Sequence, residues 1–289
     1  MLYDALIAPF AEFEFMRRAL VGVFALALGG APVGVFLMLR RMSLTGDAMA
    51  HAILPGAALG FLVAGLDLFA MTLGGIVAGV TVAVGAGLIA RATQLKEDAS
   101  LAAFYLVSLA LGVTIVSLKG SNVDLLHILF GTVLALDNAT LYLLAGIATV
   151  TLLVLAVSWR PLVMECVDPL FLRSVSRAGA PVHFAFLTLM VINLVGGFHA
   201  LGTLLAVGLM MLPAATARFW ATDITRMIAI AIGAAILSGI VGLLVSYHAG
   251  VPAGPAIILT AGAVYAVSVV LGPVGGLRRR LVPGRHLEA

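Results

Sequence analysis

The amino-acid sequence predicts an all-α polytopic membrane protein in which about nine helices cross the bilayer. Of its 289 residues, 63% are hydrophobic and only 10% are charged, and the mean hydropathy is +1.20. Soluble domains have about 45–50% apolar and about 25% charged residues, so a water-soluble enzyme and a nucleic-acid-binding protein are both excluded. A spanning helix needs ~20 mostly apolar residues, and the hydrophobic residues suffice for about nine such helices with short connections.

Long apolar runs separated by polar residues locate the spans in order along the chain. Because the alternating pattern of barrel strands is absent, these runs are expected to be helices. Residues 1–18 are expected to form an N-terminal interfacial helix, with Met16 and three phenylalanines against lipid. Residues 121–136 are apolar but short, which predicts a half-helix or re-entrant segment. The spans are expected at about 19–39, 48–66, 70–90, 101–118, 139–158, 181–198, 201–217, 226–247 and 255–273.

The basic residues predict the orientation, because cytoplasmic connections carry an excess of lysine and arginine. Thirteen of the 16 basic residues fall in alternate connections, whereas the opposite side has Lys119 alone. This places the C-terminus in the cytoplasm, and nine spans then put the N-terminus outside. Arg17 and Arg18 oppose that placement, so eight spans with the N-terminus inside remain an alternative. The thirteen are Arg40, Arg41, Arg91, Lys96, Arg160, Arg173, Arg177, Arg218, Arg226, Arg278, Arg279, Arg280 and Arg285.

One cytoplasmic connection, residues 159–180, is long and amphipathic. Asp168 precedes Pro169, and an aspartate cap followed by proline in the first turn is typical of a helix start. Gly179 is a typical helix stop. The sequence therefore predicts a short surface helix over residues 168–179, with a simple connector as the alternative.

The chain lacks the motifs of the common catalytic sites. A P-loop needs lysine between glycine and serine or threonine, and neither Lys96 nor Lys119 has those neighbours. An ATPase, if one drives this protein, must therefore be another chain. The lone Cys166 excludes an internal disulfide and a thiolate metal cluster.

Asp47 and His51 are the main candidate metal ligands. They are four residues apart, so they share one face of a helix. A carboxylate oxygen and an imidazole nitrogen suit a divalent cation such as zinc or manganese. The alternative is that Asp47 caps the helix while His51 packs nearby.

A second, weaker group of polar residues is expected on the outer side, where it resembles a vestibule for a cation. Ionisable groups in or beside spans are costly and often functional. Each of these residues alone is more often an interfacial or solvated residue than a ligand, and only the group as a whole resembles a vestibule. Glu165, Asp168 and His183, near the cytoplasmic loop, are expected to be structural. The outer group consists of Asp124, His127, Asp137, His199 and His248.

Glycines at small-xxx-small spacing predict close helix packing, and prolines inside the spans predict kinks. The glycine pairs are Gly30/Gly34, Gly56/Gly60 and Gly75/Gly79, and the prolines are Pro32, Pro55 and Pro213.

Four blocks of this sequence resemble the ABC-3 metal permeases, the membrane subunits of bacterial zinc and manganese importers. They are Leu39–Gly60 (LRRMSLTGDAMAHAILPGAALG), 123–131 (VDLLHILFG), 206–218 (AVGLMMLPAATAR) and 246–258 (SYHAGVPAGPAII). They occur in the family's order across residues 13–273, and the match is nearest to zinc permeases. Asp47 and His51 coincide with the family's G-D-A-x-x-H block, which favours the metal-site hypothesis.

The resemblance implies a single permease domain over residues 1–289 with the fold of a type II ABC importer. It implies a second permease copy, two cytoplasmic ABC ATPases that bind ATP, and an extracytoplasmic metal-binding protein, in a bacterial inner membrane. It implies transported Zn²⁺ without a permanently bound cofactor, and no enzymatic activity in this chain. The alternatives are a manganese or iron ABC permease, a siderophore or cobalamin permease, and an ion-coupled secondary carrier. The implied coupling helix, 168–179, contains Asp168, Pro169, Leu172, Arg173, Arg177 and Gly179.

Overall fold

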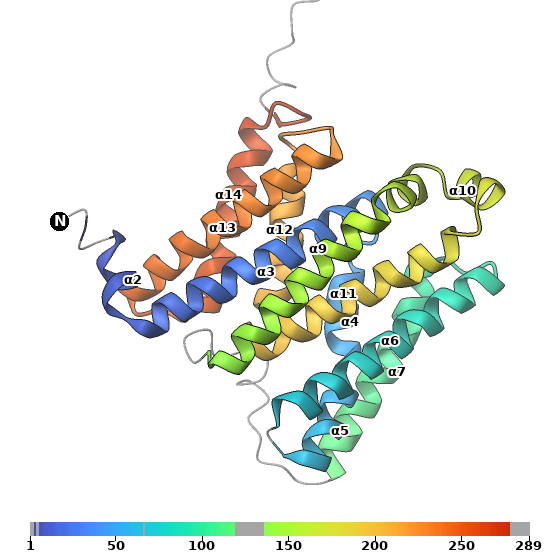
Figure 1. The fold of residues 1–289 in the computed structure, drawn as a ribbon, viewed down its shortest axis with the longest axis horizontal. Helices are drawn as coiled ribbons and strands as arrows, with labels where there is room; N and C mark the ends of the chain where they lie inside the picture. The colour runs from blue at the N-terminus through green and yellow to red at the C-terminus, as the bar shows by residue number, and fades with distance from the viewer. Residues whose placement is uncertain (1–2, 4–5, 66, 119–135, 278–289) are drawn as a thin grey trace, which may run out of the picture.

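The computed structural model describes residues 3, 6–65, 67–118 and 136–277, and every regular element in these residues is an α-helix (Figure 1). The helices are α2 (Ala8–Glu12), α3 (Glu14–Leu39), α4 (Thr45–Ala52), α5 (Leu54–Ala64), α6 (Leu68–Ala92), α7 (Glu97–Leu118), α9 (Asn138–Val167), α10 (Pro169–Val175), α11 (Gly179–Leu201), α12 (Thr203–Ala217), α13 (Ile224–Ala249) and α14 (Ala253–Leu271). The half-helix expected at 121–136 lies almost entirely outside the described residues.

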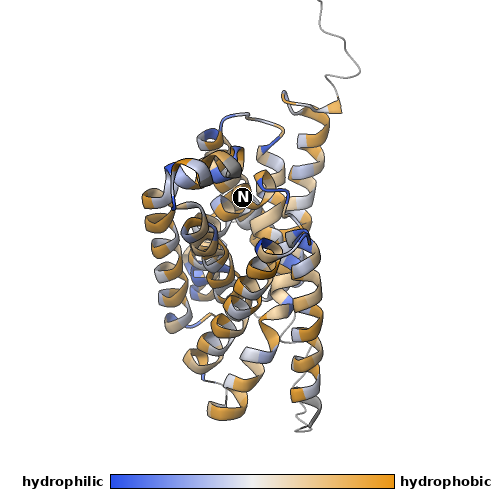
Figure 2. Cartoon of the chain, turned by 90° about the vertical axis from the view of Figure 1, so that its right-hand side faces the viewer, coloured by the Kyte–Doolittle hydropathy of each residue, from blue (hydrophilic) through white to orange (hydrophobic). Residues whose placement is uncertain are grey.

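The expected spans all correspond to helices. Within the described residues, 8 helical segments are long and apolar enough to cross a membrane, and α4 with α5 forms one of them, Thr45–Ala64. The ninth, α12, is apolar but has only 15 residues. The prediction of about nine spans is therefore confirmed. Figure 2 shows hydrophobic residues along most of the length of the helices.

Successive spans run in opposite directions (Figure 1). The connections after α3, α6, α9 and α12 consequently lie at one end of the bundle, and these are the connections that carry the basic residues. After α3 the chain reverses within a few residues. Arg41 adopts a φ of 61° in this turn, and Met42 N–H donates to the carbonyl of Leu37 at 2.9 Å.

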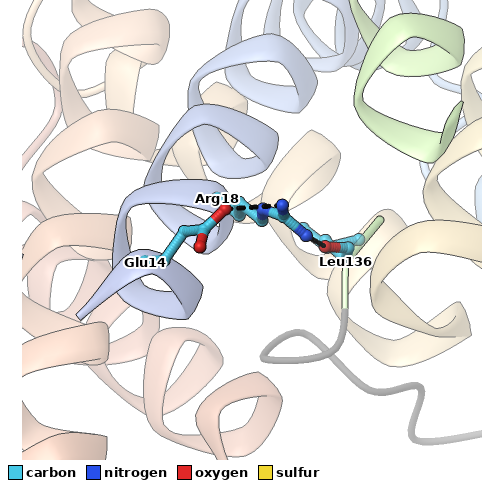
Figure 3. Close-up of polar contacts among 3 residues, drawn as sticks. All are labelled: Glu14, Arg18 and Leu136. Atoms are coloured by element: carbon cyan, nitrogen blue, oxygen red, sulfur yellow. Dashed lines mark hydrogen bonds and ion pairs between the residues drawn. The ribbon is translucent and has the colours of Figure 1, made fainter. Parts of the chain in front are cut away.

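The N-terminal segment is a short helix, α2, followed by a break at Phe13 and the first turns of α3. Met16 is 1% exposed and belongs to the hydrophobic core, so the expectation that it faces lipid is wrong. Arg18 donates to Glu14 Oε1 at 2.6 Å and to the carbonyl of Leu136 at 3.3 Å (Figure 3). Arg18 thus ties the start of α3 to the residues before α9, at the end opposite the other basic connections.

Four helices begin at an aspartate whose side chain accepts a backbone N–H of the first turn. Such caps satisfy amide groups that have no partner inside the helix. Asp137, one of the candidate vestibule residues, is among them. Hydrogen bonds from the side chain and the N–H of Thr140 lower the pKa of Asp137. The caps are Asp67 of α6, Asp137 of α9, Asp168 of α10 and Asp223 of α13.

Close helix contacts occur where the sequence has glycine. A Cβ on Gly34 of α3 would overlap the carbonyl oxygen of Met210 in α12, and a Cβ on Gly56 of α5 would overlap the carbonyl oxygen of Gly74 in α6. The backbones touch at both points, as the small-residue spacing predicts. Ile53 packs against Gly75 and Gly79 of α6 from the break between α4 and α5.

Candidate functional site

The candidate metal ligands Asp47 and His51 lie on α4, the short helix that follows the turn after α3 (Figure 1). α4 contacts α6, α7, α11 and α12. Gly46 faces Met210 of α12, and the Ser108 hydroxyl of α7 donates to the carbonyl of Ala52 at 2.8 Å. The position of α4 is therefore fixed at both of its ends.

Asp47 and His51 share the open face of α4. Thr45, Met49 and Ala52 are buried, whereas Asp47 is exposed and His51 is partly exposed in this chain. Residues four apart in a helix lie one turn apart on the same side. The polar pair is thus directed away from the neighbouring helices of its own chain, as the sequence spacing predicts.

Pro55 explains why the span is divided into two helices. A proline has no N–H to continue the ladder, and α4 ends at Ala52 while α5 begins at Leu54 with Pro55 in its first turn. The expected kink is therefore a break. Asp47 lies in the first turn of the span and His51 in the next, roughly 3 and 9 Å along the axis from Thr45 at 1.5 Å per residue.

The pair alone would not complete the coordination shell of a metal ion. Within the described residues, no group of three or more His, Cys, Asp or Glu side chains could hold a metal ion. Manganese and zinc take at least four ligands in resident sites. Asp47 and His51 could therefore supply two ligands to a cation that obtains the rest from water or from another chain.

The outer-side residues do not form a cluster in the described part of the chain. Asp124 and His127 lie outside it, and His199 is in the last turn of α11. His248 is exposed at the end of α13, where its Nδ1 is 2.9 Å from the carbonyl oxygen of Leu244 and its ring packs against Tyr247. Asp137 is a helix cap.

The expected surface helix is present but shorter than predicted. α10 spans Pro169–Val175, and Asp168 Oδ1 accepts the N–H of Phe171 at 2.9 Å, as the cap prediction requires. Ser176 is extended and ends the helix, and its hydroxyl accepts the N–H of Ala178. Gly179 is therefore not the stop but the first residue of α11, so the predicted boundary at 179 is wrong.

α10 presents an apolar pair outward. Leu172 is buried and anchors the helix, whereas Phe171 and Val175 are 48% and 68% exposed. They are four residues apart and share one face. Arg177 is exposed beyond the end of the helix. An exposed apolar face on a helix of a polar connection is typical of a protein contact.

A buried ion-pair cluster at the basic end of the bundle was not expected from the sequence. Glu165 Oε1 of α9 lies 3.6 Å from Nη2 of Arg40, at the end of α3, and 3.6 Å from Nη2 of Arg91 in α6. The guanidinium of Arg40 lies over the ring of Phe186, with 4.9 Å to the centroid. In the sequence, Arg40 and Arg91 indicate only the orientation of the protein in the membrane. The signal that could have predicted the cluster is Glu165, a single carboxylate inside an apolar run.

The sequence matches the model of the ABC 3 transport family over residues 12–272. It is 32% identical over 262 residues to the manganese import system permease protein ScaB of Streptococcus parasanguinis, covering 91% of this chain and 92% of that protein. It is 28% identical over 278 residues to the manganese transport system membrane protein MntC of Halalkalibacterium halodurans, covering 96% and 94%. A probable iron transport system membrane protein of Haemophilus influenzae is 28% identical, with 94% and 99% covered.

Solved structures have the same fold. PsaBC from Streptococcus pneumoniae in complex with Fab matches with a TM-score of 0.82 at 30% identity, covering 95% of this chain and 98% of that one. A metal-chelate type ABC transporter in an inward-facing conformation matches with a TM-score of 0.67 at 16% identity, covering 88% and 85%. The latter shows the fold alone.

Proposed function

The chain belongs to the ABC 3 transport family, and from that premise we propose that it imports manganese(II) through a site formed by Asp47 and His51. It is a multi-pass permease subunit of an ABC metal importer and is not itself an ATPase. This membership sets aside the ion-coupled secondary carrier. The observation that carries the proposal is the pair of potential ligands on the open face of α4, inside a span fixed by four other helices.

The choice of manganese over zinc rests on the relatives and on ligand chemistry. The expectation from sequence that zinc permeases are nearest finds no support in the relatives described above, whose names refer to manganese and iron. Manganese accepts carboxylate, imidazole and water together. A site with two protein ligands leaves positions for water, which suits a cation that must also be released.

We propose that ATP hydrolysis on the cytoplasmic side drives the conformational change that opens and closes the path at α4. A second copy of the permease would face the open side of α4, and two ABC ATPases would dock on α10. ATP binding and hydrolysis would move α10, and the spans joined to it would open the path alternately to the two sides. An extracytoplasmic metal-binding protein would deliver the ion. The proposed orientation has the C-terminus in the cytoplasm, because the basic connections share one end of the bundle.

The cargo can be tested by reconstituting the permease with its ATPase in liposomes and measuring uptake of Mn²⁺, Fe²⁺ and Zn²⁺ with and without ATP. We expect ATP-dependent uptake of Mn²⁺ that exceeds uptake of Zn²⁺. ATP-dependent uptake of zinc without manganese would restore the original expectation. Uptake that persists without the ATPase would contradict the ABC mechanism.

The docking role of α10 predicts that Phe171→Asp lowers transport about 30-fold. Truncating a central interface aromatic costs ~2 kcal/mol or more, and each 1.4 kcal/mol is a factor of ten in affinity. The side chain is 48% exposed, so the permease should still fold. The measurements are ATP-dependent uptake in liposomes, co-purification of the ATPase and stimulation of its activity by the permease.

The matched control is Leu277→Asp, which charges another residue at the same end with 48% exposure but away from α10. It should leave ATPase stimulation unchanged. If both variants retain the ATPase equally, α10 is not the docking element.

A further inference from the structure

A polar cavity of about 1040 Å³ opens at the basic end of the bundle, away from Asp47 and His51. It lies between the ends of α3, α6 and α9, the start of α11, and the connection before α7. Its charged lining has more cations than anions, which favours an anionic ligand over a metal cation. The charged residues are Arg40, Arg41, Arg91, Lys96, Asp98 and Glu165.

Two buried polar atoms at this cavity have no hydrogen-bond partner. The side chains of Arg40 and Glu165 are only 7% and 3% exposed. Nη1 of Arg40 and Oε2 of Glu165 are both left unsatisfied, although the other nitrogen and oxygen of the same two groups face each other at 3.6 Å. Such orphaned charged groups are costly. A ligand that accepts from Arg40 and donates to Glu165 would satisfy both.

We propose that this cavity binds a phosphate group that carries a hydroxyl or an ammonium. The phosphate oxygens would accept from Arg40 Nη1, with Arg41 and Lys96 at the rim adding positive charge. The hydroxyl or ammonium of the same ligand would donate to Glu165 Oε2. A carboxylate or chloride ion would leave Glu165 unsatisfied, and a metal cation would leave Arg40 unsatisfied.

Two sources supply this chemistry at the cytoplasmic ends of spans. Basic pockets between membrane helices on this side bind phospholipid headgroups. Phosphatidylethanolamine and phosphatidylglycerol carry a donor beside the phosphate, whereas phosphatidylcholine does not. Free inorganic phosphate also has both an acceptor and a hydroxyl. The site is separate from the proposed transport path, so its failure would leave the manganese proposal intact.

The bound phosphate would connect the helix before α4, which carries the proposed metal ligands, with the helix before α10, the proposed docking element. Arg40 leads through a short turn into α4, which carries Asp47, and Glu165 lies three residues before the cap of α10. A ligand that binds only the folded protein stabilises it by an amount that rises with the ratio of free ligand concentration to Kd. We therefore expect phosphate binding to be visible as a rise in melting temperature.

The experiment uses the purified full chain in detergent and measures bound ligand by native mass spectrometry together with the melting temperature. The probes are phosphatidylethanolamine, phosphatidylglycerol, phosphatidylcholine, diacylglycerol and inorganic phosphate. We expect the first two lipids to bind about tenfold more tightly than phosphatidylcholine or diacylglycerol. Competition by inorganic phosphate at lower concentration than the lipids would identify free phosphate as the source, and its absence would identify the headgroup.

Two sets of variants decide whether this cavity is the site. Arg40→Gln/Glu165→Gln removes both buried charges, and Arg41→Gln/Lys96→Gln changes only exposed rim residues, so the second variant folds even if the first does not. Each should weaken binding about tenfold. The controls Arg160→Gln and Arg218→Gln remove exposed cations of the same end outside the cavity. Equal losses in the controls, or binding unchanged in both cavity variants, would overturn the proposal.

Discussion

Replacing Asp47 with alanine is expected to lower manganese uptake about 100-fold or more, with no loss of folded permease. Residues that merely orient a metal ligand already cost 10–100-fold in affinity when removed, and Asp47 is proposed to be one of only two direct protein ligands. Its side chain is exposed on α4, so the substitution opens no cavity. His51→Ala should have a similar effect. The measurements are ATP-dependent ⁵⁴Mn uptake in liposomes and Mn²⁺ affinity by calorimetry.

Glu12→Ala serves as the matched control, because Glu12 is also an exposed carboxylate but lies in α2 at the N-terminal end. Its uptake should equal that of the unmodified protein. Asp47→Asn, which keeps the size and removes the charge, should resemble Asp47→Ala. Unchanged uptake in both Asp47→Ala and His51→Ala would show that the cation takes another path.

Gly56→Ala is expected to destabilise the permease by roughly 1–3 kcal/mol, the usual cost of adding atoms to a closely packed core. The added methyl group would meet the backbone of Gly74 in α6, which cannot move aside as a flexible side chain would. Separating α5 from α6 would also disturb Ile53 between α4 and α6. The measurement is the melting temperature in detergent, followed by loss of the monodisperse peak on size exclusion.

Gly262→Ala in α14 is the matched control, since nothing lies within 4 Å of a Cβ at that position. Alanine is the better helix former by about 0.5–1 kcal/mol, so this variant should melt at the same or a higher temperature. If Gly56→Ala also melts no lower than the unmodified protein, α5 and α6 are not in backbone contact at Gly56 and Gly74.

The fold was predictable because each span is a local property of the sequence. About 20 apolar residues make a helix wherever they occur in a bilayer, and every expected range corresponds to a helix or a helix pair. Boundaries were less predictable. Gly179 is suited to ending a helix, yet Ser176 ends α10 first, and glycine then opens α11. Met16 was misassigned because its burial depends on helices distant in the sequence.

The placement of Asp47 and His51 on one helix face was predictable for the same reason, and the charged cavity at the basic end of the bundle was not. Asp47 and His51 are four residues apart, so helical periodicity alone puts them on one face. Arg40, Arg91 and Glu165 meet from three separate helices. Their approach depends on how α3, α6 and α9 pack, which neither spacing nor composition encodes. Aspartate caps such as Asp137 are partly predictable. An aspartate before a helix is a local pattern that indicates a cap, but the same carboxylate can also be interpreted as a metal ligand.

The shortness of α12 has a consequence for how this helix fits into the bilayer. Fifteen residues rise about 22 Å, whereas the hydrocarbon core is ~30 Å thick. α12 is enclosed by α3, α11, α13 and α14 rather than by lipid, and Gly202 turns the chain with a φ of 85° while Leu201 and Thr203 stay buried. The length of α12 is therefore set by the helices that enclose it and not by the thickness of the bilayer. Its 15 residues end inside the protein, so the polar backbone groups at its ends need partners from the neighbouring helices and not from the lipid headgroups.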